Sequence, residues 1–177
     1  MAATVQLNET NGPSATQVET GNVSNVNMGS VDAANLVPAT YPIVAMADGH
    51  AFEKWVHLYV SALGGSTQVD NMKIWLSSLG GGWKTGEGMS TNCRTSGYSA
   101  ATYPVPGPVD TDSSVATQVM PESEPAGANL GIGGSLSGAI TSTPAYSDYA
   151  VFQLDVTAST PAGAVNTKTF TFQWDEQ

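Results

Sequence analysis

Two histidines stand close together in this chain, and histidine is the side chain best suited to proton transfer and metal binding near neutral pH. His50 and His57 are seven residues apart. Residues 52–60 alternate in character as a strand does, and an odd separation puts the two imidazoles on opposite faces of a regular strand. We therefore expect no shared metal ion, and we interpret His57, beside Trp55 and Tyr59, as a packed strand residue.

Two glycine-rich segments invite a nucleotide-binding interpretation, and neither satisfies it. In GGGWKTGEG (residues 80–88) the residue before Lys84 is Trp83, whereas a phosphate-binding loop needs glycine there. In GIGGSLSG (residues 131–138) the sixth position is Leu136, and no alternation of strand and helix surrounds the segment. Both segments are predicted to be plain loops, and no cofactor is expected.

The acidic stretch Asp110–Ser114 (DTDSS) resembles the start of a calcium loop. The sixth position of such a loop is Val115 here instead of glycine, and the twelfth is Pro121 instead of glutamate. A weak surface cation site is one interpretation of the clustered carboxylates, and a solvated acidic loop is the better one. We assign no metal-ligating residue.

No arrangement of nucleophile, base or paired acids is apparent. Glu53 and Asp155 lie in predicted strands, but nothing in the sequence pairs them as a hydrolase would require. Cys93 is the single cysteine, which excludes an intrachain disulfide, and no nearby base would activate it. We predict no catalytic residue and a protein that is not an enzyme.

Three aromatic residues fall in the irregular region that follows residue 79. Trp83, Tyr98 and Tyr103 are interspersed with glycine and proline. Aromatic rings on a loop stack on sugar rings in one interpretation; in the other they hold the loop to the body of the protein or to a neighbouring subunit. These three residues are our candidate partner contacts.

The charge composition restricts the class of partner. The chain has 177 residues and a net charge of −10, yet only 11% of its residues are charged. A surface of this kind consists mostly of neutral polar groups, and its five scattered basic residues argue against nucleic acid and against an anionic membrane surface. No signal peptide and no apolar span is recognisable, so we expect an intracellular protein or one released inside a particle.

The elements that position these residues are predicted to be strands. Within residues 51–79, alternation over 52–60 and 72–76 around a Gly/Ser turn predicts a core hairpin. Its apolar face is expected to pack on four residues of the C-terminal strands: Phe152, Leu154, Phe170 and Phe172. Further short strands are predicted at residues 4–7, 22–28, 42–46, 115–120, 149–157 and 165–175.

These elements predict an all-β fold, an antiparallel β-sandwich with long Gly/Pro-rich loops at residues 80–108 and 122–138. Immunoglobulin-like and jelly-roll topologies both fit. The C-terminal strands are expected to form either a long hairpin or an arch between the two sheets. Residues 1–177 are predicted to be one domain, in which residues 1–40 either fold onto the body or extend to a neighbour.

The blocks FEKWVHLYV (52–60), DYAVFQLDV (148–156) and TFTFQWDE (169–176), in a chain rich in Thr, Gly, Ser and Ala, resemble structural proteins of tailed bacteriophage particles. The likeness is to the small β-sandwich proteins that decorate capsids. It implies a non-enzymatic decoration protein on the outer face of the capsid in the virion. The major capsid protein and other virion proteins would be its partners, and the protein itself would be a homo-oligomer, with a trimer favoured. The alternative is a carbohydrate-binding or adhesin module that uses the loop aromatics.

Overall fold

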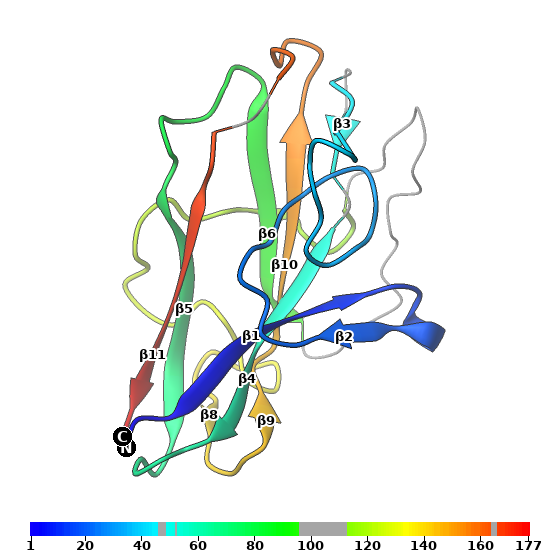
Figure 1. Ribbon diagram of the computed structural model, residues 1–177. Helices are drawn as coiled ribbons and strands as arrows, with labels where there is room; N and C mark the ends of the chain where they lie inside the picture. Colours follow the sequence, from blue (N-terminus) through cyan, green and yellow to red (C-terminus); the bar gives the residue numbers. More distant parts are fainter. Residues whose placement is uncertain (46–48, 52, 96–112, 164–165) are drawn as a thin grey trace.

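The computed structural model describes residues 1–45, 49–51, 53–95, 113–163 and 166–177 (Figure 1). The described part is all-β, with one short 3-10 helix. The elements are β1 (Thr4–Asn11), η1 (Ser14–Thr16), β2 (Val18–Thr20), β3 (Gly49–His50), β4 (Lys54–Ala62), β5 (Val69–Ser78), β6 (Glu87–Thr95), β7 (Gln118–Val119), β8 (Ala139–Ile140), β9 (Ala145–Tyr146), β10 (Tyr149–Val156) and β11 (Thr169–Glu176). Among the described residues, no helix is long and apolar enough to cross a membrane.

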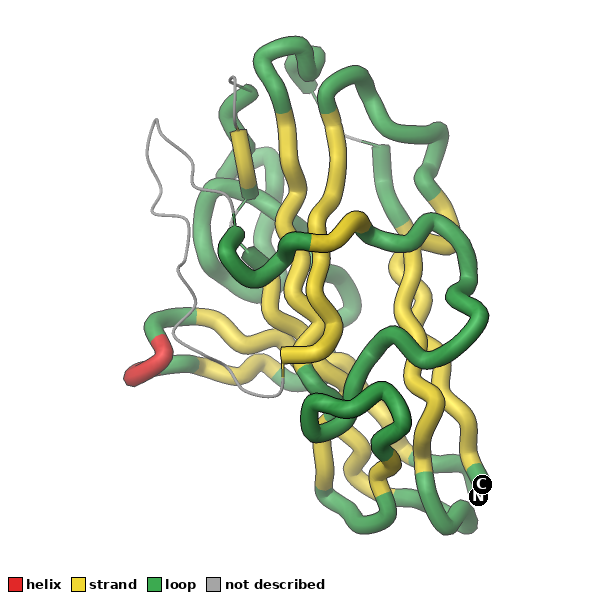
Figure 2. Tube along the Cα trace, turned by 180° about the vertical axis from the view of Figure 1, so that it is seen from behind, coloured by secondary structure: helices red, strands yellow, loops and turns green. Residues whose placement is uncertain are grey.

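Two antiparallel sheets make up the sandwich that the sequence predicts. The larger sheet has the order β2-β1-β4-β10-β6-β7, with β3 added beside β10 and β9 beside β4. The smaller sheet has the order β11-β5-β8. Figure 2, which views the molecule from behind, shows the pair of sheets and the two chain termini side by side at one end.

The order of the long strands identifies the topology. In chain order these strands are β1, β4, β5, β6, β10 and β11, and the larger sheet joins the first, second, fifth and fourth of them. The smaller sheet joins the third and the sixth. An immunoglobulin-type sandwich pairs its first six strands in the same way. Of the two topologies that the sequence leaves open, the immunoglobulin-like one fits this strand order.

The apolar core lies between the sheets and uses the residues that alternation predicts. Its members include Val56 and Leu58 of β4, Ile74 and Leu76 of β5, and Phe152 of β10, all almost fully buried. The partly buried rings of Phe170 and Phe172 pack against the same cluster. The predicted contact between residues 51–79 and the C-terminal strands is therefore confirmed.

The predicted hairpin between the two central strands is wrong. β4 belongs to the larger sheet and β5 to the smaller one, so the turn at residues 63–68 is an arch that crosses the core. A hairpin and an arch produce the same alternation of apolar residues, because each strand buries one face in either case. The C-terminal strands β10 and β11 likewise lie in different sheets, which is the arch interpretation of that region.

Four other expectations change. No strand forms at residues 22–28 or in the described part of 42–46, and the strand expected at 115–120 is reduced to the two residues of β7. The loop expected at residues 80–108 instead contains β6, which pairs with β10 along most of its length. Met89, Thr91 and Cys93 of β6 alternate and are buried, a signal hidden by the surrounding glycines and polar residues.

Candidate functional site

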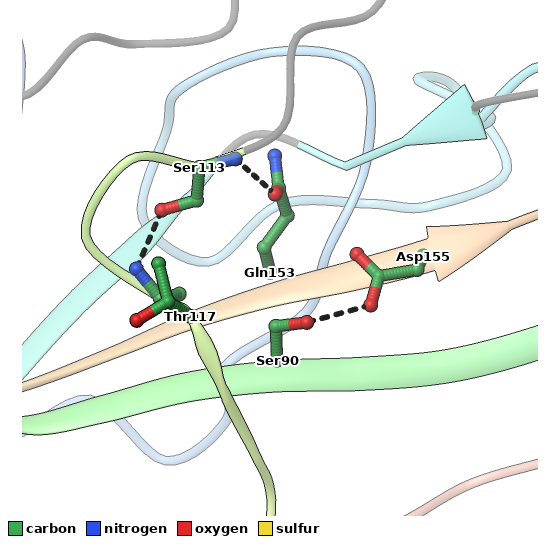
Figure 3. Close-up of a pocket in the computed structure, with 6 residues that line it drawn as sticks. Ser90, Ser113, Thr117, Gln153 and Asp155 are labelled. Carbon is green, nitrogen blue, oxygen red and sulfur yellow. Dashed lines mark hydrogen bonds between the residues drawn. The ribbon is translucent and has the colours of Figure 1, made fainter.

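A shallow depression of about 280 Å³ lies on the outer face of the larger sheet (Figure 3). It is lined by Ser90, Ser113, Ala116, Thr117, Gln153 and Asp155. β6 supplies Ser90, and β10 supplies Gln153 and Asp155 because odd-numbered residues of β10 face outward, opposite to the core residue Phe152. Apart from Ala116 the lining is polar, and the Asp155 carboxylate is its one charged group.

The polar groups of this depression are paired with one another. The Ser90 hydroxyl donates to Asp155 Oδ2 at 2.8 Å, and the Ser113 amide donates to Gln153 Oε1 at 2.7 Å. His50 Nε2 lies 3.7 Å from Asp155 Oδ1. The carboxylate thus lies between serine and histidine, whereas a hydrolytic triad needs the histidine in the middle to take the serine proton. The arrangement does not supply an activated nucleophile.

A second group of polar and aromatic residues lies on the same outer face, near β1, β2 and β9. The His57 ring is stacked on Tyr149, with 4.5 Å between ring centroids, and lies 4.7 Å from the Tyr146 ring. His57 Nε2 is 2.9 Å from Glu19 Oε2 of β2. Burial lowers the pKa of His57 and outweighs the opposing effect of the Glu19 carboxylate. His57 is packed as predicted, and its chemistry is that of a neutral, buried imidazole.

The more accessible part of this group is a pair of tyrosines with the side chains of Gln6 and Glu19. Tyr59 and Tyr146 face each other across β4 and β9, with ring centroids 4.9 Å apart, and Tyr146 is 45% exposed. On β1, the Gln6 side-chain amide donates to Asn8 Oδ1 at 2.9 Å, and Asn8 donates to Glu19 Oε1 at 2.8 Å. We call Gln6, Asn8, Glu19, Tyr59 and Tyr146 the tyrosine platform.

Sequence reasoning did not single out the platform. Tyr59 belongs to the alternating segment, but Tyr146 comes from a two-residue strand. The two residues are 87 positions apart in the chain and meet only because β4 pairs with β9. No local pattern encodes such a pairing. The one sequence signal is the aromatic outward face of β4, formed by Trp55, His57 and Tyr59.

Of the three aromatic residues predicted to contact a partner, the structure describes Trp83. Trp83 is half-buried, its indole Nε1–H donates to Glu122 Oε1 at 2.6 Å, and Lys168 Nζ lies 4.6 Å from its ring centroid. These contacts favour the interpretation that Trp83 holds its loop to the protein body. Tyr98 and Tyr103 lie outside the described residues, and a partner contact at these three positions stays a prediction.

Several ionisable residues are buried within the sandwich. Lys54 Nζ donates to Glu9 Oε1 at 2.8 Å, with both side chains fully buried, and to Ala33 O at 2.6 Å. Burial raises the pKa of Glu53, which accepts a hydrogen bond from the Trp55 indole. In the described ranges no three His, Cys, Asp or Glu side chains are gathered as a metal ion requires.

No family model, curated protein or solved structure matches this chain.

Proposed function

We propose that the protein is a non-enzymatic structural protein of a virus particle, a decoration protein bound to the outer face of the capsid. The observation that carries this proposal is where the basic residues lie. Lys54, Lys73 and Lys168 are each drawn into an ion pair and are nearly buried, next to Glu9, Glu124 and Glu87 respectively. Of the other two basic residues Lys84 is half-buried, and the side chain of Arg94 lies outside the described part, so the described exterior is poor in basic groups.

Such an exterior suits a protein that lies against protein neighbours. Neutral polar groups enter an interface without the large cost of removing an ion from water. An acidic surface poor in lysine and arginine also suits the outside of a capsid better than the side that faces the genome. The resemblance in residues 52–60, 148–156 and 169–176 supports the same class of protein.

The test is the protein content of purified particles. Particles from a culture that produces this protein are banded in a density gradient, and the bands are examined by mass spectrometry and by immunogold labelling with an antibody to the chain. We expect the chain in the particle band, labelled on the outer surface, and a homo-oligomer by light scattering of the isolated protein. Absence of the chain from purified particles contradicts the proposal.

The tyrosine platform favours a second function, the binding of a neutral glycan. Tyrosine rings stack on the apolar face of a pyranose, and amide and carboxylate oxygens accept hydrogen bonds from its hydroxyls. Asn8 is only 2% exposed and bonds both Gln6 and Glu19, so the accessible polar atoms are those of Gln6 and Glu19. The acid on the platform disfavours an anionic sugar.

This second function is tested by affinity electrophoresis in gels that contain starch, xylan, galactomannan or β-glucan. Retardation of the protein by one of these polysaccharides, and its loss in Tyr146→Ala, would support glycan binding. Tyr41→Ala is the matched control, because Tyr41 is 42% exposed and its backbone hydrogen bonds go to Ser30 and Val37, which are not platform residues. Equal retardation of both variants, or none of the native protein in any gel, contradicts it.

A further inference from the structure

The smaller sheet ends in a long open edge. β11 pairs with β5 on one side, and among the described residues no strand pairs with its other side. β11 has eight residues, whereas the other strands at the sheet ends, β2, β7 and β8, have three, two and two. An open edge presents unpaired backbone N–H and C=O groups to any extended chain that approaches it.

The groups that point outward can be identified from the far side of β5. Ile74 donates its N–H to Asn129 Oδ1 and accepts from Asn129 Nδ2, each at 2.8 Å, so both backbone groups of Ile74 face away from β11. Its antiparallel partner on β11 is Phe172. In an antiparallel pair, the backbone N–H and C=O groups of the two residues either point toward each other or point away from each other. Those of Ile74 point away from β11, so Phe172 directs its own N–H and C=O to the open edge.

The same reasoning applies two residues earlier. Leu76, the partner of Phe170, donates its N–H to Pro121 O at 2.8 Å on the far side of β5. Phe170 therefore also directs its backbone groups to the open edge, whereas Thr171 and Gln173 are directed to β5. The edge offers two donor–acceptor pairs at the spacing of a regular strand.

The side chains at this edge are apolar and incompletely covered. Phe170, Phe172 and Trp174 pack against the core cluster but remain only partly buried. The strand sequence TFTFQWDE contains no proline and no lysine, two of the devices by which proteins keep other strands from an edge. Another strand here would satisfy the backbone groups and cover the rings.

Within the described residues, the topology leaves the same position without a strand. In an immunoglobulin-type sandwich the seventh strand pairs with the sixth, on the side away from the third. Here the sixth long strand is β11 and the third is β5, so the place of the seventh strand is the open edge of β11. The acidic side chains of Asp175 and Glu176 lie at the end of that edge and are exposed.

We propose that the open edge of β11 binds an extended segment of a partner protein, which adds as an antiparallel strand. The segment carries apolar residues at alternate positions, to cover the rings of Phe170 and Phe172. It begins with a basic residue, because its first residues lie beside Asp175 and Glu176. This inference does not depend on the virion proposal, since strand addition requires only the edge.

Amide hydrogen exchange of the isolated protein, resolved by NMR, provides the first test. We expect the amides of Phe170 and Phe172 to exchange rapidly and those of Thr171 and Gln173 slowly. Binding of the fluorescent probe peptide Lys-Thr-Val-Thr-Val-Thr-Val-Gly should protect Phe170 and Phe172. Protection of these two amides before the peptide is added, or no protection afterwards, would overturn the inference.

Two controls separate strand addition from nonspecific adhesion. A peptide of the same sequence with N-methyl groups on the amides that face β11 keeps its side chains but loses its donors, and should bind about tenfold more weakly. Asp175→Lys should weaken the lysine-led peptide about threefold and favour a glutamate-led one. Equal binding of the methylated peptide overturns the inference, as does a dimer whose edge amides are already protected, since the occupant would then be a second copy.

Discussion

At the scale of single residues, the buried pair of Lys54 and Glu9 has the largest energetic consequence. Lys54 lies at the start of β4 and Glu9 is on β1, on the faces that point into the protein, where the segment around Ala33 covers them. Asn11 adds a second bond to Glu9 Oε1 at 2.9 Å and one to Asp32 at 2.6 Å, so the ion pair also holds that covering segment. Removal of one charge leaves the other buried and unpaired.

We predict that Lys54→Met lowers the free energy of unfolding by about 3–5 kcal/mol, the usual cost of breaking a buried pair from one side. The double variant Lys54→Met, Glu9→Gln should recover most of this loss, because no charge is then left unpaired. Urea unfolding followed by tryptophan fluorescence measures both. A single variant as stable as the native protein would contradict the prediction.

The cysteine is predicted to be unreactive. Burial raises the pKa of Cys93 to about 11, so the thiol is protonated near pH 8. Because the side chain is buried, reagents also have no access to it. Ellman's reagent at pH 8 should therefore give no rapid signal with the native protein and one thiol per chain in denaturant. A rapid native-state reaction would show that β6 opens or that the thiol is exposed.

His57 should make stability depend on pH. Because burial lowers its pKa below the ordinary 6.5, the unfolded chain binds more protons than the native protein as the pH falls below 6.5. The contribution of His57 is thus fully present above pH 6.5 and is lost as the pH falls from there to the lowered pKa. We predict that His57→Gln reduces this slope in unfolding measurements between pH 5 and 7.5; an unchanged slope would assign it to other groups.

At the scale of elements, the loop after β7 acts as a substitute strand. The Asn129 side chain bonds both backbone groups of Ile74, and Leu130 is buried in the core beside it. A loop with little regular structure of its own therefore completes the hydrogen bonding of β5. Residues 122–138 are irregular as predicted, but their role as an edge cover follows from contacts far apart in the chain.

We predict that Asn129→Ala destabilises the protein by roughly 1–3 kcal/mol, because it leaves the N–H and C=O of Ile74 without partners in a nearly dry position. Asn166→Ala is the matched control: its side chain donates to Gly82 O at 2.9 Å in a part-buried position. The control should change stability by less than half as much. Thermal unfolding measures the loss of stability in the two variants. Equal losses would contradict the role assigned to Asn129.

At the scale of the whole molecule, the fold brings the N-terminus and the C-terminus close together. The Ala3 amide donates to Glu176 Oε2 at 2.9 Å, and Met1 O accepts from the Gly65 amide at 2.7 Å. The termini and the β4–β5 arch therefore meet at one end of the molecule (Figure 1). The open edge of β11 ends at this corner, so a partner segment bound there would lie next to both termini.

The amino-acid sequence by itself determined the all-β class, the four strands β4, β5, β10 and β11, and the faces that they bury. Those properties follow from side-chain alternation within a few residues, which is a local signal. It also determined the neutral, lysine-poor character of the exterior, since that is a matter of composition.

Only the tertiary structure decided which strands pair. The hairpin predicted within residues 51–79 became an arch, and β6 was found in a region read as loop, because pairing depends on contacts between distant residues that leave the same local pattern in either arrangement. The tyrosine platform and the open edge of β11 arise in the same way. No local sequence pattern marks their residues. The platform exists because β4 pairs with β9, and the edge exists because no described strand pairs with the outer side of β11.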